Sequence, residues 1–155
     1  MCGIAGTFSY NSRQPVDKEL LEKMTASIAH RGPDGHGYYF SKDRLLGFGH
    51  RRLSIIDLST GDQPMCNEDK TVWITFNGEV YNYRELRDVL KARGHKFKTS
   101  SDTEVVIHAY EEWGKDCVTK FNGIFAFGIW DEKQQQLYLA RDHFGVKPLY
   151  YYQNG

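Results

Sequence analysis

Cys2 directly follows the initiator methionine, and a small side chain at this position permits removal of Met1. The residue would then hold two reactive groups, a thiol with an ordinary pKa of about 8.5 and an α-amine with one of about 7.7–8.0. The amine can take the proton of the thiol, so the residue is a nucleophile that carries its own base. A cysteine at position two is more often an ordinary residue, so other segments must decide.

Four further segments offer groups that could complete such a site. Asn77 and Gly78 supply a side-chain amide and an open backbone N–H, the donors that stabilise an oxyanion, although Asn-Gly is more often a tight turn. Arg52, beside an apolar run, could hold a carboxylate or could be a surface arginine. Asp102 could bind an ammonium group or cap a helix. Residues 31–35 could be a helix stop followed by a turn.

These residues need strands and helices to hold them. Alternating or continuous apolar runs bounded by turn residues predict strands at 4–10, 38–40, 45–49, 72–76, 125–130 and 137–140, and a last strand at 150–152. Helices are expected between them, each with an N-cap, an apolar face and a stop. The first helix would be capped by Asp17, bury Leu20, Leu21, Met24 and Ile28, and stop at Gly32 and Pro33. The second would begin with a capping box of Asn82 and Glu85, bury Leu86, Val89 and Leu90, and stop at Gly94. The third would begin with a capping box of Ser101 and Glu104, carry Val105, Val106, Ala109, Tyr110 and Trp113, and stop at Gly114. Hairpin-connected strands with inserted helices indicate an α+β fold with antiparallel sheets.

Composition excludes several classes of protein. Twenty Lys and Arg balance twenty Asp and Glu, so no strong field attracts nucleic acid. No signal peptide or bilayer-length apolar run is present, which argues against a membrane protein and favours the cytoplasm. Cys2, Cys66 and Cys117 lack paired spacing, which argues against disulfides and against a zinc site and fits a reducing compartment.

Several motifs, taken in order, resemble those of the class II glutamine amidotransferases, and most closely the branch of asparagine synthetase (glutamine-hydrolysing). They are Cys2-Gly-Ile-Ala-Gly, Arg31-Gly-Pro-Asp, Arg52-Leu-Ser-Ile-Ile-Asp, Gly61-Asp-Gln-Pro, Asn77-Gly-Glu-Val-Tyr-Asn, Ser101-Asp-Thr-Glu-Val, Phe125-Ala-Phe and Arg141-Asp-His-Phe-Gly-Val-Lys-Pro-Leu-Tyr. The resemblance covers essentially the whole chain. It implies an N-terminal-nucleophile hydrolase fold, in which two antiparallel sheets are stacked between helical layers.

The resemblance also implies a role for each site residue in the hydrolysis of L-glutamine. Cys2 would be the nucleophile, and Asn77 with the Gly78 N–H would form the oxyanion hole. Arg52 would bind the α-carboxylate, Leu53, Ile55 and Ile56 would line the pocket, Glu79 and Asp102 would receive the α-ammonium, and Arg31 and Asp34 would support the site. No cofactor or metal is expected in this chain.

Members of this branch continue beyond such a segment and add an ATP-dependent synthetase domain. We therefore expect residues 1–155 to be one glutaminase domain, incomplete at its C-terminus, with ATP and Mg²⁺ used by the covalently attached domain that this sequence lacks. An incomplete sheet edge predicts instability or self-association, which sizing chromatography would detect, and a homodimer remains open.

Alternative functions remain open. The chain could bind glutamine without hydrolysing it, as a regulatory module, for example if Met1 is retained. The released ammonia could serve an acceptor other than aspartate. The least specific interpretation treats Cys2, Asn77 and Asp102 as turn and cap residues of a structural domain.

Overall fold

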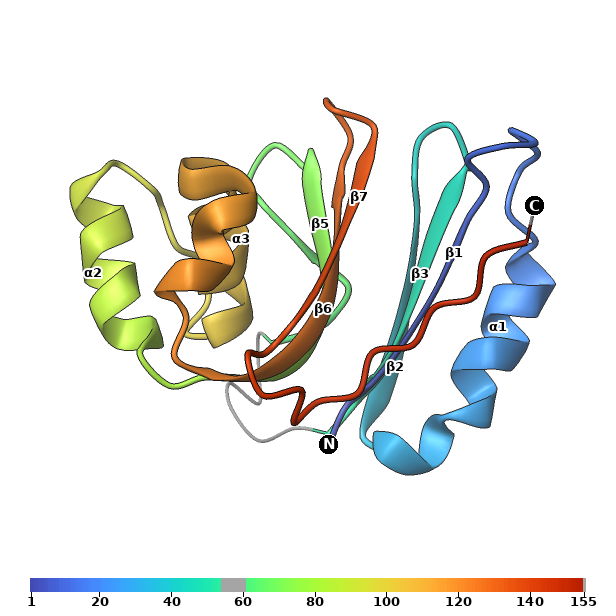
Figure 1. The fold of residues 1–155 in the computed structure, drawn as a ribbon, viewed down its shortest axis with the longest axis horizontal. Helices are drawn as coiled ribbons and strands as arrows, with labels where there is room; N and C mark the ends of the chain where they lie inside the picture. Colours follow the sequence, from blue (N-terminus) through green and yellow to red (C-terminus); the bar gives the residue numbers. More distant parts are fainter. Residues whose placement is uncertain (54–60, 155) are drawn as a thin grey trace.

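The computed structural model describes residues 1–53 and 61–154 (Figure 1). Along this part of the chain the elements are β1 (Gly3–Phe8), α1 (Lys18–Ser27), a 3₁₀ turn (Ala29–Arg31), β2 (Gly35–Phe40), β3 (Leu46–Arg52), β4 (Met65–Cys66), β5 (Val72–Val80), α2 (Tyr83–Ala92), α3 (Asp102–Trp113), a second 3₁₀ segment (Gly114–Lys120), β6 (Gly123–Asp131) and β7 (Gln136–Arg141). None of the helices in the described ranges is long and apolar enough to span a bilayer.

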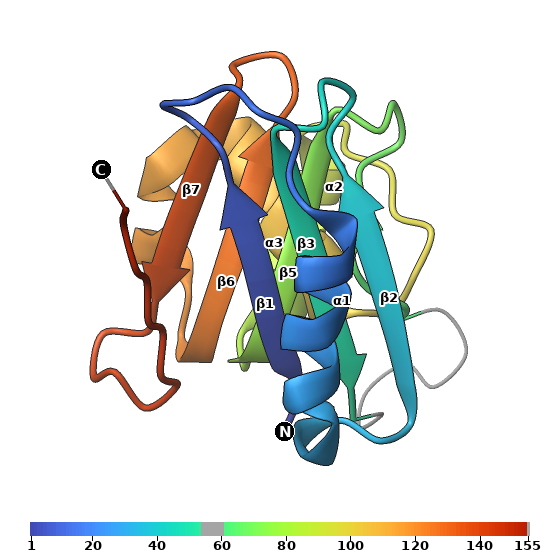
Figure 2. The same ribbon diagram turned by 90° about the vertical axis from the view of Figure 1, so that its right-hand side faces the viewer.

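The strands form two antiparallel sheets, in the orders β1-β3-β2 and β4-β5-β6-β7. Helix α1 covers the outer face of the first sheet, and α2 and α3 lie on the outer side of the second, so the two sheets face each other (Figure 1). Figure 2 shows α1 in front of the three-stranded sheet. The predicted α+β class, with two antiparallel sheets between helical layers, is confirmed.

Apolar side chains gather in two places. The larger cluster lies between the four-stranded sheet and its helices and includes Ile74, Leu90 and Ile107, all fully buried. The smaller one lies between the sheets and includes Phe48 and Trp130. Burial of each such side chain stabilises the fold by about 1.5–3 kcal/mol, so both the helix layer and the sheet stacking are held by hydrophobic contacts.

Helix α1 begins where the sequence predicts, because the Asp17 carboxylate accepts hydrogen bonds from two N–H groups of the first turn, at 2.9 and 3.2 Å. The observed helix ends at Ser27, earlier than predicted, and a 3₁₀ turn at 29–31 follows it. The prediction that Leu20 faces inward is wrong, since its side chain is 49% exposed.

The fully buried residues of α1 are Leu21, as predicted, and Thr25, which was not predicted to face inward, while Met24 and Ile28 are half-buried. The reason lies on β3, where glycines stand under Leu21 and Thr25. A Cβ at Gly47 would lie 2.8 Å from the Leu21 side chain, and one at Gly49 would lie 2.0 Å from Thr25 Oγ1. The two glycines therefore let α1 lie close against the sheet and determine which face is buried.

Helices α2 and α3 start at the predicted residues, but only one cap is as expected. The Ser101 hydroxyl accepts a hydrogen bond from Thr103 N at 3.1 Å and caps α3. The capping box predicted at Asn82 is wrong, because the Asn82 side chain donates to Lys120 O and accepts from Asn122 N, both at 2.9 Å. Asn82 thus joins the start of α2 to the segment before β6.

Two other side chains predicted to serve these helices have different surroundings. Val89 is 44% exposed, so the prediction that it lies on the inward face of α2 is wrong. The Glu104 carboxylate accepts hydrogen bonds from Lys98 N and Thr99 N, each at 2.8 Å, rather than completing a capping box. Glu104 therefore ties the loop before α3 to the first turn of that helix.

Strand β5 is longer than the predicted 72–76 and pairs with β6 from Val72 to Val80. Asn77 and Gly78 therefore lie inside a strand and not in a turn. The prediction of a last strand at 150–152 is wrong, because within the described chain this segment has no strand partner. Its three tyrosine side chains are between 82% and 91% exposed.

Candidate active site

Cys2 directly precedes β1, and its thiol touches the end of β3. Leu53 N donates a hydrogen bond to Cys2 Sγ at 3.4 Å, and the Cys2 thiol donates one to Leu53 O at 3.6 Å. The pairing of Gly3 with Arg51 holds the two chain segments side by side. Arg31 Nε donates to Cys2 O at 3.2 Å, so this predicted supporting residue is in contact with Cys2. The thiol is thus held by backbone contacts and is not on a free end.

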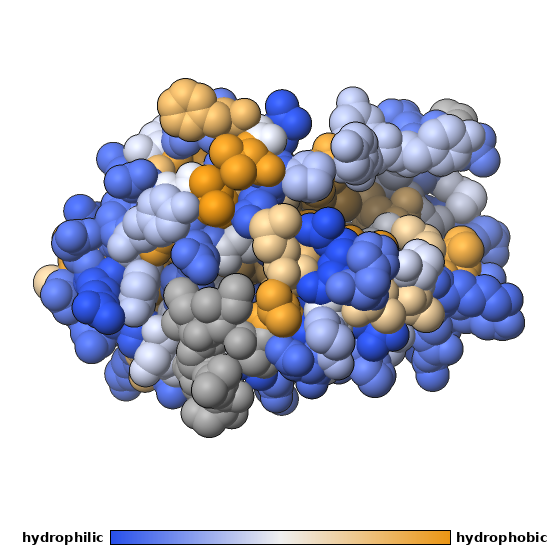
Figure 3. All heavy atoms as spheres, turned by 90° about the horizontal axis from the view of Figure 1, so that it is seen from below, coloured by the Kyte–Doolittle hydropathy of each residue, from blue (hydrophilic) through white to orange (hydrophobic). Residues whose placement is uncertain are grey.

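The alternation of side chains along β1 and β3 turns Cys2 toward the second sheet. A Cβ at Gly3 would lie 2.9 Å from the Ile28 side chain, so Gly3 faces the α1 layer and Cys2 faces the opposite way. On β3, His50 faces the second sheet, where Nδ1 lies 3.2 Å from a β5 threonine hydroxyl. Arg52, two residues on, shares that orientation. The end of the molecule at which β1 begins is mainly hydrophilic in Figure 3.

On β5, Asn77 and Glu79 face the first sheet. Ile74 and Phe76 belong to the apolar cluster against the helices, whereas Thr75 meets β3 between the sheets. Since side chains alternate along a strand, the odd-numbered residues that follow Thr75 point the same way. The predicted oxyanion donor and one predicted ammonium partner therefore face the same space between the sheets as Cys2 and Arg52.

Gly78 occupies a position that only glycine can fill. A Cβ at Gly78 would lie 2.1 Å from Ile124 O on β6, so a larger residue would force the two strands apart. Asn77, just before it, is 4% exposed. The β5–β6 ladder thus holds both predicted oxyanion-hole residues rigidly.

Asp102 and Glu79 form an acidic pair where β5 ends and α3 begins. Asp102 is 5% exposed, and its Oδ2 accepts a hydrogen bond from Val80 N at 2.9 Å. Burial raises the pKa of Asp102, and the charge of Glu79 adds to this rise, while hydrogen bonds from backbone N–H groups oppose it. A positively charged group beside both carboxylates would be favoured electrostatically.

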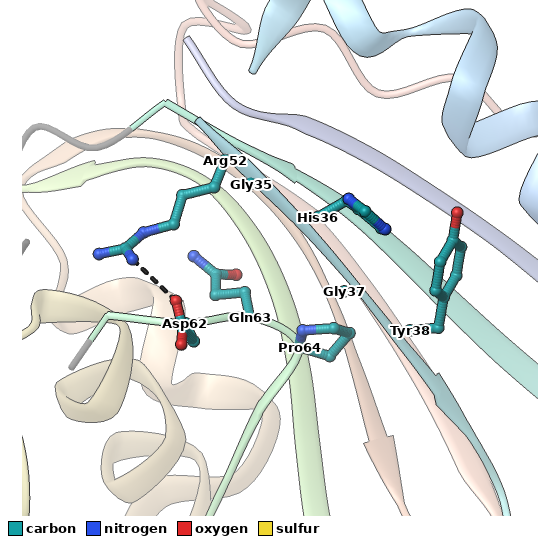
Figure 4. A pocket seen from close by; sticks show the side chains of 8 residues that line it. All are labelled: Gly35, His36, Gly37, Tyr38, Arg52, Asp62, Gln63 and Pro64. Atoms are coloured by element: carbon teal, nitrogen blue, oxygen red, sulfur yellow. Dashed lines mark hydrogen bonds and ion pairs between the residues drawn. The ribbon is translucent and has the colours of Figure 1, made fainter. Parts of the chain in front are cut away.

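Arg52 lines an open pocket of about 280 Å³ together with residues 35–38 of β2 and with Asp62, Gln63 and Pro64 (Figure 4). The guanidinium Nη1 donates to Asp62 Oδ1 at 2.8 Å. The Arg52 side chain is 12% exposed, whereas that of Asp62 is 90% exposed. An ion pair this open to water is weak, so a substrate carboxylate could take the place of Asp62.

Gln63 connects three elements of the site, a role that was not predicted from the sequence. Its Oε1 accepts a hydrogen bond from Phe76 N at 2.7 Å, and its Nε2 donates to Thr103 Oγ1 at 3.5 Å. A Cβ at Gly37 would lie 2.2 Å from Gln63 O. The residue thus joins β2, β5 and the first turn of α3, and the only sequence signal for it was the motif at 61–64.

Segment 31–34 lies against the last residues of β3. Asp34 N donates a hydrogen bond to Arg52 O at 3.0 Å. A Cβ at Gly32 would lie 2.5 Å from the Arg51 backbone, so this glycine permits the close approach. Arg31, at the other end of the segment, reaches Cys2. The structure therefore brings both predicted supporting residues beside the predicted site.

The predicted pocket lining is only partly described. Leu53 contacts Cys2 through its backbone N–H and C=O. Ile55 and Ile56 lie outside the described residues.

Three other titratable side chains, one beside the site and two cysteines farther away, are poor candidates for the same chemistry. His50 is fully buried, and burial, followed by the charge of Arg52, lowers its pKa to about 3, so the ring is neutral. Burial raises the pKa of the Cys117 thiol to about 12 and raises that of Cys66 as well. Cys2 is therefore the thiol best placed to react as a nucleophile.

Curated relatives of this chain are asparagine synthetases. Asparagine synthetase [glutamine-hydrolyzing] 1 of Bacillus subtilis (strain 168) is 50% identical over 97% of this chain and 24% of its own length. Asparagine synthetase [glutamine-hydrolyzing] 3 of the same organism is 45% identical over 100% of this chain and 25% of its own length. Asparagine synthetase [glutamine-hydrolyzing] 1 of Arabidopsis thaliana is 43% identical over 97% of this chain and 25% of its own length. The chain spans about a quarter of the length of these relatives.

A solved structure shares the fold. Glutamine phosphoribosylpyrophosphate (PRPP) amidotransferase from B. subtilis, complexed with ADP and GMP, superposes with a TM-score of 0.61 at 19% identity, covering 91% of this chain and 36% of that protein. The sequence matches the glutamine amidotransferase domain family over residues 1–155. By this match and by its relatives, the chain belongs to the glutamine amidotransferase domain family.

Proposed function

We propose that this chain hydrolyses L-glutamine to glutamate and ammonia, with Cys2 as the nucleophile. The observation that carries the proposal is that the start of β1 and the ends of β3 and β5 lie at one end of the stacked sheets (Figures 1 and 2). Cys2 directly precedes β1, Arg52 ends β3, Glu79 lies near the end of β5, and Asp102 accepts a hydrogen bond from Val80 N. Arg52 would take the α-carboxylate in place of Asp62, and the two acids would take the α-ammonium. The side-chain amide of the substrate would then lie against the Cys2 thiol.

The reaction follows from the groups that Cys2 carries once Met1 is removed. The α-amine takes the thiol proton, and the thiolate attacks the amide carbon. The Asn77 side chain and the Gly78 N–H donate hydrogen bonds to the oxyanion that forms. The intermediate collapses as the protonated amine gives its proton to the departing ammonia. Water then hydrolyses the γ-glutamyl thioester, again with the amine as base, and restores the thiol.

The ammonia would serve an acceptor elsewhere in a longer protein. Residues 1–155 would be the glutaminase domain, and the relatives' names point to asparagine formation. The amidation of aspartate would use ATP and Mg²⁺ bound outside this chain. An acceptor other than aspartate would leave the chemistry at Cys2 unchanged.

The first test is covalent labelling by 6-diazo-5-oxo-norleucine, a glutamine analogue with an electrophilic side-chain carbon. Because the analogue shares both α-groups of glutamine, the proposed pocket should bring it to Cys2. We expect intact mass measurement to show one adduct on protein that lacks Met1, and glutamine to slow the labelling.

Cys2→Ala is the matched control and should show no adduct, since Cys117 and Cys66 have raised pKa values. Adduct formation in Cys2→Ala would assign the reactive thiol elsewhere. Folded, Met1-free protein that binds glutamine without forming an adduct would favour a non-hydrolytic binding module.

A second test concerns the raised pKa of Asp102. As pH falls through this pKa, Asp102 becomes neutral and loses its attraction for the α-ammonium, so the KM for glutamine should rise toward low pH. Asp102→Asn should raise KM by about tenfold to a hundredfold and flatten its dependence on pH. Glu79 faces the same group and can also titrate, so Glu79→Gln should be profiled in parallel. A KM for Asp102→Asn that equals the wild-type value would contradict the assignment.

A further inference from the structure

Histidine and carboxylate side chains gather between α3 and the loop that follows α2, in the outer helical layer and away from the thiol. His95 comes from the loop, and His108 and Glu111 lie one turn apart on α3. One potential ligand atom from each of the three residues lies within 4.8 Å of the other two. His108 is fully buried, whereas the side chains of His95 and Glu111 are 17% and 24% exposed.

Both imidazoles turn the same nitrogen toward one carboxylate oxygen. His108 Nδ1 lies 2.6 Å from Glu111 Oε2, and His95 Nδ1 lies 3.7 Å from that same oxygen. The two ring nitrogens thus face one shared carboxylate oxygen between the loop and the helix.

The opposite nitrogen of each ring also faces a carboxylate. His95 Nε2 lies 3.1 Å from Glu112 Oε2, and His108 Nε2 lies 3.9 Å from Glu104 Oε1 without a hydrogen-bond partner in the described chain. The second oxygen of Glu111 accepts a hydrogen bond from an asparagine amide at 2.6 Å. Metal-binding histidines typically donate their free N–H to a carboxylate, and metal-binding carboxylates are held by hydrogen bonds in the same way.

We propose that His95 Nδ1, His108 Nδ1 and Glu111 Oε2 bind a divalent transition-metal ion, with Zn²⁺ as the best match. Two imidazoles and one carboxylate are a common zinc ligand set, with bonds of about 2.0–2.2 Å, which places tetrahedral ligand atoms about 3.4 Å apart. The separations of 2.6 and 3.7 Å come within about 1 Å of that spacing. Water would fill the fourth position on the partly exposed side.

Such an ion would link two segments of the chain. It would clamp the loop between α2 and α3 onto the middle of α3, adding to the contacts that Glu104 makes with the same loop. The arrangement does not depend on glutamine hydrolysis, because none of its ligands touches the proposed active site.

The test is a Co²⁺ titration of metal-free protein, because tetrahedral Co²⁺ absorbs visible light. It uses the wild type and Cys2→Ala in parallel, since an N-terminal cysteine can chelate metal through its amine and thiol. We expect one Co²⁺ site that persists in Cys2→Ala, that lacks a sulfur-to-cobalt charge-transfer band there, and that Zn²⁺ displaces.

His95→Gln and Glu111→Gln should each weaken this site by about a hundredfold or more, since loss of an outer partner alone typically costs 10–100-fold. Glu68→Gln is the matched control. It removes an equal charge that acts on His108 but supplies no ligand, so the affinity should stay within a few-fold of the wild-type value. The absence of saturable binding in Cys2→Ala would overturn the proposal. The proposal would also be overturned if Glu68→Gln lost as much Co²⁺ affinity as Glu111→Gln, or if His95→Gln kept the wild-type affinity.

Discussion

Asn77→Ala is expected to lower the kcat for glutamine hydrolysis by about 10²–10³-fold, with little change in KM. The Asn77 amide lies on the inner face of β5, on a strand that its pairing with β6 holds rigid. A donor aimed at an oxyanion acts mainly when the oxyanion exists, so its loss raises the barrier without weakening the binding of substrate. Steady-state measurement of glutamate and ammonia release separates the two constants.

Asn82→Ala is the matched control, because Asn82 follows β5 closely and its side chain bonds to Lys120 O and Asn122 N instead of facing the site. We expect this variant to lose stability, by about 1 kcal/mol for each hydrogen bond, and to keep its kcat. A similar loss of kcat in both variants would mean that Asn77 acts through folding. A change confined to KM would make Asn77 a substrate-binding residue.

The local parts of the fold were predictable because their causes lie close in sequence. Asp17 and Ser101 are caps that act within their own first turns, and both were predicted correctly. The buried face of α1 was predicted only in part, with Leu21 placed correctly, Leu20 placed wrongly and Thr25 missed, because it depends on Gly47 and Gly49, which belong to a distant strand. The inward placement of Val89 failed for a related reason, since apolar spacing cannot show how wide a face the neighbouring elements cover.

In the candidate site, too, roles tied to a sequence motif were predicted, whereas contacts between distant segments were not. The resemblance assigned roles to Cys2, Arg52 and Asn77, and the structure places all three at one end of the space between the sheets. Asp62 and Gln63 received no role because their contacts, to Arg52 and to the β5 backbone, join segments that are separate in the sequence. Their effect on the site became visible only after folding.

The cluster of His95, His108 and Glu111 had no signal in the sequence, and the expectation that this chain binds no metal stays a prediction. The expectation that no zinc site exists rested on cysteine spacing alone. His108 and Glu111 share a helical turn, but His95 lies in a different segment and reaches them only because the chain reverses between α2 and α3. A ligand set that spans a loop and a helix has no characteristic spacing in the sequence.

Blocking the α-amine of Cys2 is expected to lower kcat by about 10²–10⁴-fold, the usual contribution of a general base. A matched pair of proteins tests this directly. One carries an N-terminal extension before Cys2, and the other is the same protein after a protease has cut directly before Cys2. The thiol and the pocket are common to both, so the difference in steady-state rate reports the amine alone. Intact mass confirms the state of each terminus.

The outcome decides between two origins of the base. Within the described residues, Cys2 Sγ has hydrogen bonds only to the backbone of Leu53, so no side chain is in place to take its proton. His50, turned toward the same inter-sheet space, has a pKa lowered to about 3 and cannot serve near neutral pH. Equal rates before and after cleavage would therefore contradict the proposed mechanism at its first step. A large gain on cleavage, without a gain in the corresponding Cys2→Ala protein, would support the amine as the base.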